Sequence, residues 1–364
     1  MSNYVKYNNR IAFHPGYYIN EIVEESGLTQ EDFAKRLGTT PKNLSILIRG
    51  EQSLSIDMAM RLSRMLGTSI QYWLNLQNTY NTLIAEFKSE EELVLERKVF
   101  EKLDYKYFKE YFGLPDLPRK INEQIKQVRE CLNVATLTVL EKKELSVCFR
   151  SAVDTMSDSN IIKANTMVQI AVNQALNTNR YAKFNKTKFK QAVDYALTLT
   201  KNHDDFFPSI KKSFLDAGVI FIILPNISGS KINGATKKIG DQIMLMVNDR
   251  RLYSDTFWFT LFHEVGHIMN GDFGISFENE NNQKEISANK YAEDLLIHPS
   301  EYAKFIENND FSKDAIIDFA KHIDRDPGII LGRLQNEKLV DYKDRNLQSL
   351  KQTYKVKLAN NSEM

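Results

Sequence analysis

Apolar residues recur at helical spacing through the first 80 positions of the chain. From Pro15 to Gln77 this period predicts five short helices, separated by turn signals such as Gly38, Gly50 and Gly67. Thr29-Gln30-Glu31-Asp32 has the form of a capping box, and Thr40 precedes Pro41 as an N-cap residue precedes the first helical position. Residues 1–81 are therefore expected to form a five-helix domain.

The second and third of these helices, joined by a short turn that begins at Gly38, make a helix-turn-helix candidate. In that motif the second helix lies in the major groove of double-stranded DNA, where Asn can pair with adenine and Arg or Lys with guanine. On the pattern alone, a small helical interaction bundle is the alternative. The polar residues expected to contact DNA are Gln30, Thr39, Thr40, Lys42, Asn43, Ser45 and Arg49.

The charge balance of this region argues against tight binding of DNA by a single copy. Residues 1–80 carry eight Lys and Arg against seven Asp and Glu, and the whole chain of 364 residues has a net charge of +1. Phosphate neutralisation dominates affinity for DNA, so a monomer should bind operator DNA weakly and a homodimer is expected. The balance gives no general argument for binding nucleic acid or a membrane surface.

The rest of the chain changes in character near residue 206. Residues 82–205 have a charged helical pattern without a catalytic constellation, and are expected to connect two functional ends. Residues 206–344 contain apolar runs at 218–225, 234–236 and 242–248, which predict a small mixed sheet with helices packed on it. The polar tail, 345–364, is expected to fray. The fold class is therefore mostly α, of the α+β type.

The strongest chemical signal is His263-Glu264-Val265-Gly266-His267. On a helix the two imidazoles lie one turn apart on one side, the spacing of a zinc site, and Glu264 can serve as general base toward water. A surface helix that happens to carry two histidines is the alternative. Gly266 within this helix predicts that another element packs closely against it.

A catalytic zinc site also needs a third ligand. Glu285, on the next predicted helix, is the candidate for one Zn²⁺ per chain, with Asn289 one turn away to orient an imidazole. Glu278, Glu280 and Glu293 remain alternatives to Glu285. Tyr253 and His298 are candidates to stabilise an oxyanion. Ser254 or Asp255 is expected to cap the zinc helix, and residues 242–247 are expected to form a sheet edge that pairs with substrate.

Cellular location follows from what the sequence lacks. Cys131 and Cys148 have no CxxC context and are interpreted as buried thiols in a reducing compartment. No secretory signal and no apolar run long enough to span a membrane is evident. A cytoplasmic protein without membrane association is expected.

Residues 215–335 resemble the ImmA/IrrE-type zinc metallopeptidases. The matching residues are Phe259 to His267, Glu285, Ala288-Asn289, Tyr291-Ala292 and Leu295-Leu296, while Ile297-His298-Pro299 departs by one residue from many relatives. The resemblance implies a zincin-like domain with a gluzincin-like site whose ligands come from His263, His267 and Glu285.

Residues 13–81 look like the HigA-type antitoxin branch of phage-repressor-like (XRE-like) helix-turn-helix domains. The similarity rests on Phe13-His14-Pro15-Gly16, Ile48-Arg49-Gly50 and, most specifically, Trp73-Leu74-Asn75-Leu76-Gln77 followed by Tyr80. It implies dimeric binding to operator DNA, often at the protein's own promoter.

Two functions follow as expectations. In the first, a DNA-binding transcriptional regulator is fused to a zinc-dependent endopeptidase that cleaves a repressor or toxin partner. In the second, the chain is a HigA-like antitoxin or repressor that regulates its own operon, and its zinc domain serves sensing or structure without proteolysis.

Overall fold

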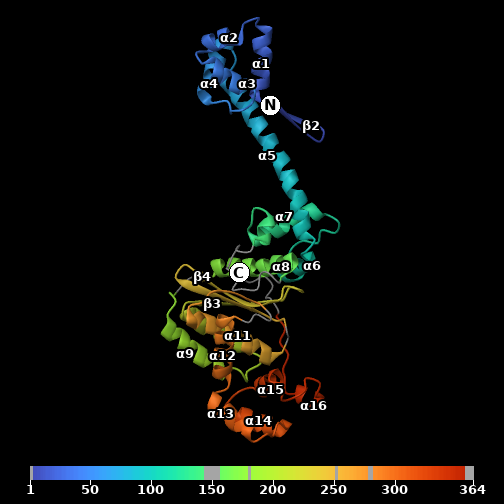
Figure 1. The fold of residues 1–364 in the computed structure, drawn as a ribbon, viewed down its shortest axis with the longest axis vertical. Coiled ribbons are helices and arrows are strands. Elements are labelled where there is room, and N and C mark those ends of the chain that lie inside the picture. The colour runs from blue at the N-terminus through green and yellow to red at the C-terminus, as the bar shows by residue number, and fades with distance from the viewer. Residues whose placement is uncertain (1–2, 143–155, 179–181, 251–252, 278–281, 357–364) are drawn as a thin grey trace. The chain divides into compact units, whose positions relative to one another are not determined.

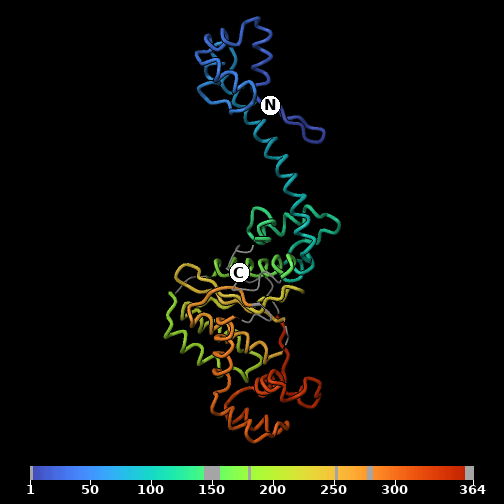
Figure 2. Tube along the Cα trace, viewed as in Figure 1, coloured from blue at the N-terminus to red at the C-terminus, as the bar shows by residue number. Residues whose placement is uncertain are grey.

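A computed structural model describes residues 3–142, 156–178, 182–250, 253–277 and 282–356. The chain divides into two compact units, residues 1–95 and 96–364, which are followed from blue to red in Figures 1 and 2. This division is coarser than the four segments expected from the sequence, whose boundaries stay predictions. The described helices include none that is both long and apolar enough to cross a bilayer.

The first unit contains the five expected helices and one hairpin that the sequence pattern did not indicate. Strands β1 (Tyr4–Tyr7) and β2 (Arg10–Phe13) pair antiparallel ahead of the helices. The helices are α1 (Pro15–Glu25), α2 (Gln30–Leu37), α3 (Pro41–Ile48), α4 (Ile56–Leu66) and α5 (Ile70–Phe100), whose last five residues belong to the second unit. Their core is closed around fully buried Leu44, Leu47 and Trp73.

The helix boundaries follow from the capping residues. Thr29 and Thr40 each accept a hydrogen bond from the backbone N–H three residues on, and Gly38 ends α2 with φ of 72°. His14 caps α1 through Nδ1, which accepts from the Gly16 N–H at 3.0 Å. Helix α5 runs well past Gln77, because neither Gly nor Pro occurs between Ile70 and Phe112 to stop it.

Helices make up most of the second unit as well. They are α6 (Tyr105–Phe112), α7 (Ile121–Leu132), a 3₁₀ turn (Leu137–Glu141), α8 (Asp158–Asn177), α9 (Lys186–Thr198), α10 (Phe206–Asp216), α11 (Ser254–Asn270), α12 (Gln283–Leu296), α13 (Pro299–Glu307), α14 (Lys313–His322), α15 (Pro327–Asn336) and α16 (Arg345–Gln348). Helices α8 and α11 cover opposite faces of the sheet, as Figure 1 shows.

The sheet of this unit is small and mixed, as expected. Its order is β3 (Val219–Leu224), β5 (Gln242–Asn248), β4 (Ile232–Ile239), β6 (Gly274–Phe277), with β3 and β5 parallel and the other pairs antiparallel. The prediction that residues 242–247 form an edge was wrong, because β5 is paired on both sides. Its continuous apolar run is typical of a strand whose two faces are both covered, here by α8 and α11.

The C-terminal segment also differs from expectation. Residues 345–356 do not fray: Leu347 and Leu350 are buried in the core of the second unit, and the Ser254 N–H donates to the Gln352 carbonyl at 2.9 Å. Lys351 forms a buried ion pair with Asp255 at 2.8 Å. Composition did not reveal these contacts, because they are few and each needs a partner that is distant in the sequence. Residues 357–364 lie outside the described part.

Candidate metal centre and nucleic-acid interface

Helix α11 is held by its apolar side and ends at a glycine. Leu261, Phe262 and Val265 are fully buried, and Gly271 closes the helix with φ of 73°. The expected cap at Ser254 or Asp255 was wrong. Tyr253 stands at the N-cap position without a side-chain cap bond, and the Asp255 carboxylate pairs with Lys351 instead.

Close packing of α11 on α12 brings the candidate ligands together. A Cβ at Gly266 would lie 3.2 Å from the Ala288 Cα and from the Tyr291 Cβ, so the helices approach as the glycine predicted. Asn282 caps α12 and accepts from the N–H of Glu285 at 3.0 Å, which fixes the first turn of that helix. Glu285 thereby faces both histidines.

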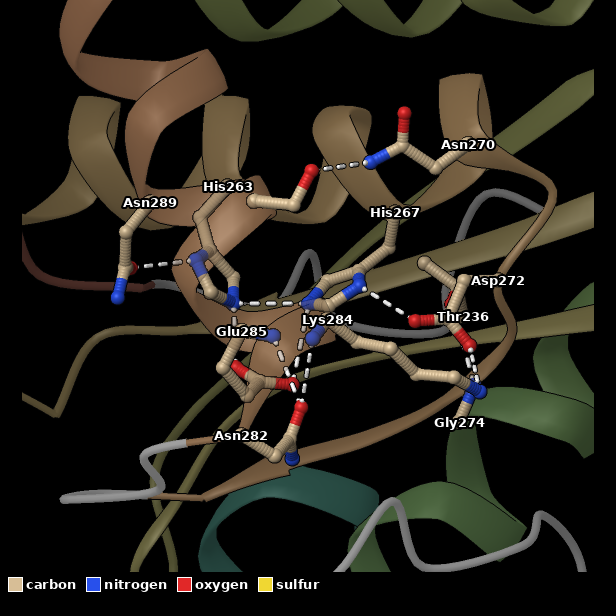
Figure 3. A network of polar contacts seen from close by, with 11 residues as sticks. Thr236, His263, His267, Asn270, Asp272, Gly274, Asn282, Lys284, Glu285 and Asn289 are labelled. Atoms are coloured by element: carbon tan, nitrogen blue, oxygen red, sulfur yellow. Dashed lines mark hydrogen bonds and ion pairs between the residues drawn. The ribbon is translucent and has the colours of Figure 1, made fainter.

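Figure 3 shows the convergence of these side chains. His263 Nε2 lies 3.0 Å from Glu285 Oε2, His267 Nε2 lies 3.2 Å from Glu285 Oε1, and the two Nε2 atoms are 3.0 Å apart. Each of the three residues is at most 7% exposed. Within the described ranges, they form the one group of His, Cys, Asp and Glu placed to hold a metal ion.

The hydrogen bond made by Nδ1 of each histidine determines whether its Nε2 can bind a metal. His263 Nδ1 lies 2.8 Å from Asn289 Oδ1, and His267 Nδ1 lies 3.1 Å from Asp272 Oδ2. Both oxygens are acceptors, so a neutral ring donates its Nδ1–H outward and turns the lone pair of Nε2 inward. Two nitrogen lone pairs and a carboxylate then face one point, where they repel one another unless a cation lies between them.

The donor set fits zinc. Catalytic zinc sites take two His and one Glu at about 2.0–2.2 Å, which sets neighbouring donors about 3.3 Å apart in a tetrahedron. The observed separations of 3.0–3.2 Å are close to that value. Burial opposes charge on Glu285, but in the metal-free protein protonated imidazoles donate to it from Nε2, and these hydrogen bonds lower the pKa of its carboxyl to about 2.

Glu264 packs between α11 and strand β4. Its side chain is fully buried, and a Cβ at Gly234 would lie 2.5 Å from Glu264 Oε1. Burial opposes charge on His263, but hydrogen bonding to Glu285 and the nearby charges of Glu264 and Glu285 raise its pKa. Sequence reasoning missed Gly234, although glycine inside a strand pattern often marks a close approach.

Two further residues of this network were missed. Besides accepting from His267, Asp272 receives a hydrogen bond from Lys284 Nζ at 2.9 Å, so a lysine holds the carboxylate that orients the imidazole. Asp272 directly follows the helix stop at Gly271, a weak signal by itself. The backbone reversal that returns it to His267 is visible only in the fold.

Other candidates are placed elsewhere. Tyr253 precedes His263 by ten residues along α11, about 15 Å of helix, and His298 follows Glu285 by thirteen, across nearly the full length of α12. His298 caps α13 through Nδ1. The structure therefore does not bring either oxyanion candidate to the three ligands.

The alternatives to Glu285 and the cysteines are accounted for similarly. Glu293 lies about 12 Å along α12 from Glu285, while Glu278 and Glu280 fall outside the described residues. Cys131 is half-buried, and burial raises the pKa of its thiol to about 11, so it is unreactive. Cys148 also lies outside the described part.

The predicted DNA-contacting residues lie on the outer side of α2 and α3. Leu44, Leu47 and Ile48 point inward, whereas Gln30, Thr40, Lys42, Asn43 and Arg49 are exposed, and Thr39 and Ser45 are half-buried. Hydrogen bonds already orient two of these side chains. Asn43 donates to Thr39 Oγ1 and accepts from Gln52 Nε2, each at 3.2 Å, and Arg49 pairs with Glu51 at 2.8 Å and contacts Ser45. Gln52 was missed.

Comparison with known proteins addresses this first unit. The helix-turn-helix family HTH_3 matches residues 19–73. The HTH-type transcriptional regulator YddM of Escherichia coli K12 is 38% identical over 79 residues, which cover 21% of this chain and 84% of that protein. The chain belongs to the HTH_3 helix-turn-helix family. Virulence-associated protein I of Dichelobacter nodosus is 34% identical over 80 residues, 22% of this chain and 74% of that protein.

Three solved structures align over the same share of the chain, 23% in each case. They are an antidote protein of a plasmid maintenance system from Nostoc punctiforme (33% identity, 93% of that chain, TM-score 0.22), a Pseudomonas aeruginosa protein in complex with its operator DNA (28%, 91%, 0.21) and an addiction module antidote protein of the HigA family from Coxiella burnetii (29%, 94%, 0.22). Each of these matches covers less than a quarter of the chain.

Proposed function

We propose that this chain is a DNA-binding transcriptional regulator whose second unit is a zinc-dependent endopeptidase. The convergence of His263 Nε2, His267 Nε2 and the Glu285 carboxylate, with their lone pairs facing one point, carries the peptidase part. The ImmA/IrrE-like pattern from Phe259 to Leu296 supports it. Membership of the helix-turn-helix family supports the DNA-binding part.

Each residue near the three ligands has a distinct task. His263, His267 and Glu285 hold the ion, while Asn289 and Asp272 fix the two imidazoles in the orientation that binds it. A bound Zn²⁺ would act as a Lewis acid toward water and a peptide carbonyl. Glu264 accepts a proton from the attacking water and delivers it to the leaving amine. Gly234 leaves the space in which the Glu264 carboxylate stands.

The substrate is a protein, either a repressor or a toxin partner. A helix-turn-helix unit on the same chain would bring the peptidase to operators, where other regulators bind, and would raise their local concentration. Cleavage of such a partner would turn a signal in the second unit into a change in transcription. The DNA-binding form is proposed to be a homodimer, because the first unit carries little net positive charge.

The decisive experiment compares wild type with Glu264→Gln. Metal analysis of the purified chains should give one zinc in each, and only the wild type should generate new N-termini in proteins encoded by neighbouring genes. Loss of a general base typically costs about 10²–10⁴ in rate. His263→Ala should lose both zinc and cleavage.

The outcomes separate the two expected functions. Cleavage by Glu264→Gln at the wild-type rate would remove Glu264 from the mechanism. Stoichiometric zinc with no cleavage by the wild type would leave the antitoxin-like regulator, in which the zinc unit serves sensing or structure.

The DNA-binding part has its own test. Wild-type protein should retard the DNA upstream of its own gene in a gel shift, whereas the Asn43→Ala, Arg49→Ala double variant should not. The single variant Arg36→Ala, an exposed arginine at the end of α2, serves as a control for lost charge. Retardation by the double variant at wild-type affinity would exclude α3 as the recognition helix.

A further inference from the structure

A cavity lies in the unit that carries the metal centre, toward the N-terminal end of α11. It measures about 590 Å³, within the roughly 300–1,000 Å³ range of small-molecule sites. Its walls come from the start of α11, the end of α12, helix α15 and the segment from Tyr342 to Lys351. In Figure 1 these helices carry the orange-to-red colours of the C-terminal part.

One part of the wall is apolar. Leu296, Ile297 and Ile329 are buried, and Phe259 adds an aromatic face. An apolar wall of this kind takes up hydrocarbon, since removing such surface from water is favourable by about 25 cal/mol per Å². The cavity therefore suits a ligand with an apolar body.

The polar part of the wall is dominated by two immobilised cations. Arg333 is 18% exposed; its guanidinium lies 3.7 Å from the centre of the Tyr302 ring, and its Nε donates to Glu337 at 3.0 Å. Lys351 is 5% exposed and paired with Asp255. Because these contacts already fix both side chains, a ligand would lose little entropy by binding to them.

Donors exceed acceptors at this wall. Arg333 carries five N–H groups, and its bonds within the described residues go to Glu337 and, at 3.5 Å, to the Glu293 carbonyl. Asp255 is paired with Lys351, and Glu337 with Arg333. Glu293 is the third acid, and burial raises the pKa of its carboxyl, which reduces its repulsion of an anion. The unmatched polar capacity of the wall is therefore the remaining N–H donors of Arg333.

We propose that this cavity binds a small organic acid, with its carboxylate on Arg333 and its apolar body against Phe259, Leu296 and Ile297. A guanidinium fork matches a carboxylate bidentately, which favours an acid over an alcohol or an amine of the same length. None of the three metal-ligand candidates lines the cavity, so this binding can be tested independently of the peptidase.

Calorimetric titration of the full chain as purified tests the proposal with three probes of equal length: octanoate, 1-octanol and octylamine. Octanoate should bind saturably with one site per chain. The alcohol and the amine should bind roughly 10- to 100-fold more weakly, the effect of one hydrogen bond to a charged group. No saturable heat with octanoate, or equal affinity for the three probes, overturns the assignment.

Two variants locate the site. Arg333→Gln should lose that same factor in octanoate affinity, while Arg119→Gln, an exposed arginine elsewhere in the unit, should bind as wild type does. Asn336→Trp adds bulk at an exposed position of the cavity rim without removing a charge, and should also weaken binding. It decides the case if Arg333→Gln fails to fold. Wild-type affinity in a folded Arg333→Gln or in Asn336→Trp contradicts the proposal.

Discussion

The two units of this chain place their candidate functional residues in opposite ways. In the first unit, the residues proposed to contact DNA sit on the outside of two consecutive helices and need no distant partner to be exposed. In the second unit, the candidate ligands are buried, come from two helices, and rely on residues as far apart in sequence as Gly234 and Asn289. A surface that reads DNA can be recognised from a short pattern, whereas a buried centre depends on packing.

Metal removal should separate the units most clearly. Chelation would withdraw the proposed zinc ion, which only the folded second unit would bind and which at a thousandfold excess of zinc over Kd would be worth about 4 kcal/mol. Its Tm should fall by roughly 8–16 °C for a unit of this size, while the transition of the first unit stays in place. Differential scanning calorimetry with and without chelator measures both. Equal shifts in the two transitions would contradict independent units.

Gly234→Ala should come next in size. The new Cβ would lie 2.5 Å from Glu264 Oε1 and must displace that carboxylate. Peptidase activity should fall about 10²-fold, the lower end for a lost general base, with zinc still bound. Asn233→Ala, the neighbouring change on β4, is the control. Full activity in Gly234→Ala would mean that the position of Glu264 does not matter.

Asp272→Ala tests the orientation of His267. Removing a carboxylate behind a ligating imidazole typically lowers metal affinity about 10- to 100-fold. Competition with a fluorescent zinc chelator measures the change. Asp318→Ala, a surface acid on α14, should leave zinc affinity unaltered. If the two variants bind zinc equally well, the Asp272–His267 contact has no role in the site.

In the first unit, effects should depend on whether a residue reads bases or phosphates. Asn43→Ala should cost about 1–3 kcal/mol and relax sequence preference at one base pair. Lys42→Ala should weaken all sequences alike and reduce the salt slope by about 1. Fluorescence anisotropy over a salt series and a set of single-base variants distinguishes them. Identical profiles for the two variants would refute the assigned geometry.

The smallest effect is expected at the start of α3. Thr40→Ala removes the side-chain acceptor for the Asn43 N–H and should cost about 1 kcal/mol. The first unit should melt roughly 4–8 °C lower, with the second unit unaffected. Thr79→Ala, on the exposed side of α5, should be neutral or slightly stabilising because alanine is the better helix former. A neutral Thr40→Ala would show that the cap is dispensable.

Much of the local structure was predictable because it depends on neighbours in sequence. Thr40 before Pro41, Gly38 as a stop, and the apolar run at 218–225 were each sufficient to place a boundary or a strand. The spacing of His263, His267 and Glu285 likewise put compatible side chains on the faces of two helices. These are properties of the helical and extended periods.

Predictions failed where a distant segment decides. The position of β5 in the sheet, the role of Asp255 and the packing of residues 345–356 each depend on a partner about 10 to 100 residues away. An apolar strand reads the same at 242–248 whether it has one neighbour or two. From the sequence, Lys351 is expected to be a solvated residue of a polar tail. Its burial is evident only from the fold, which brings Asp255 beside it.

The sequence by itself determined which residues could do chemistry, because side-chain type and helical period are written locally: two imidazoles and a carboxylate in register, and a short exposed recognition helix. Tertiary structure alone decided that Asp272 orients His267, that Gly234 makes room for Glu264, and that Arg333 and Lys351 border a cavity. These arrangements arise from close packing between elements far apart in the chain, which no local period encodes.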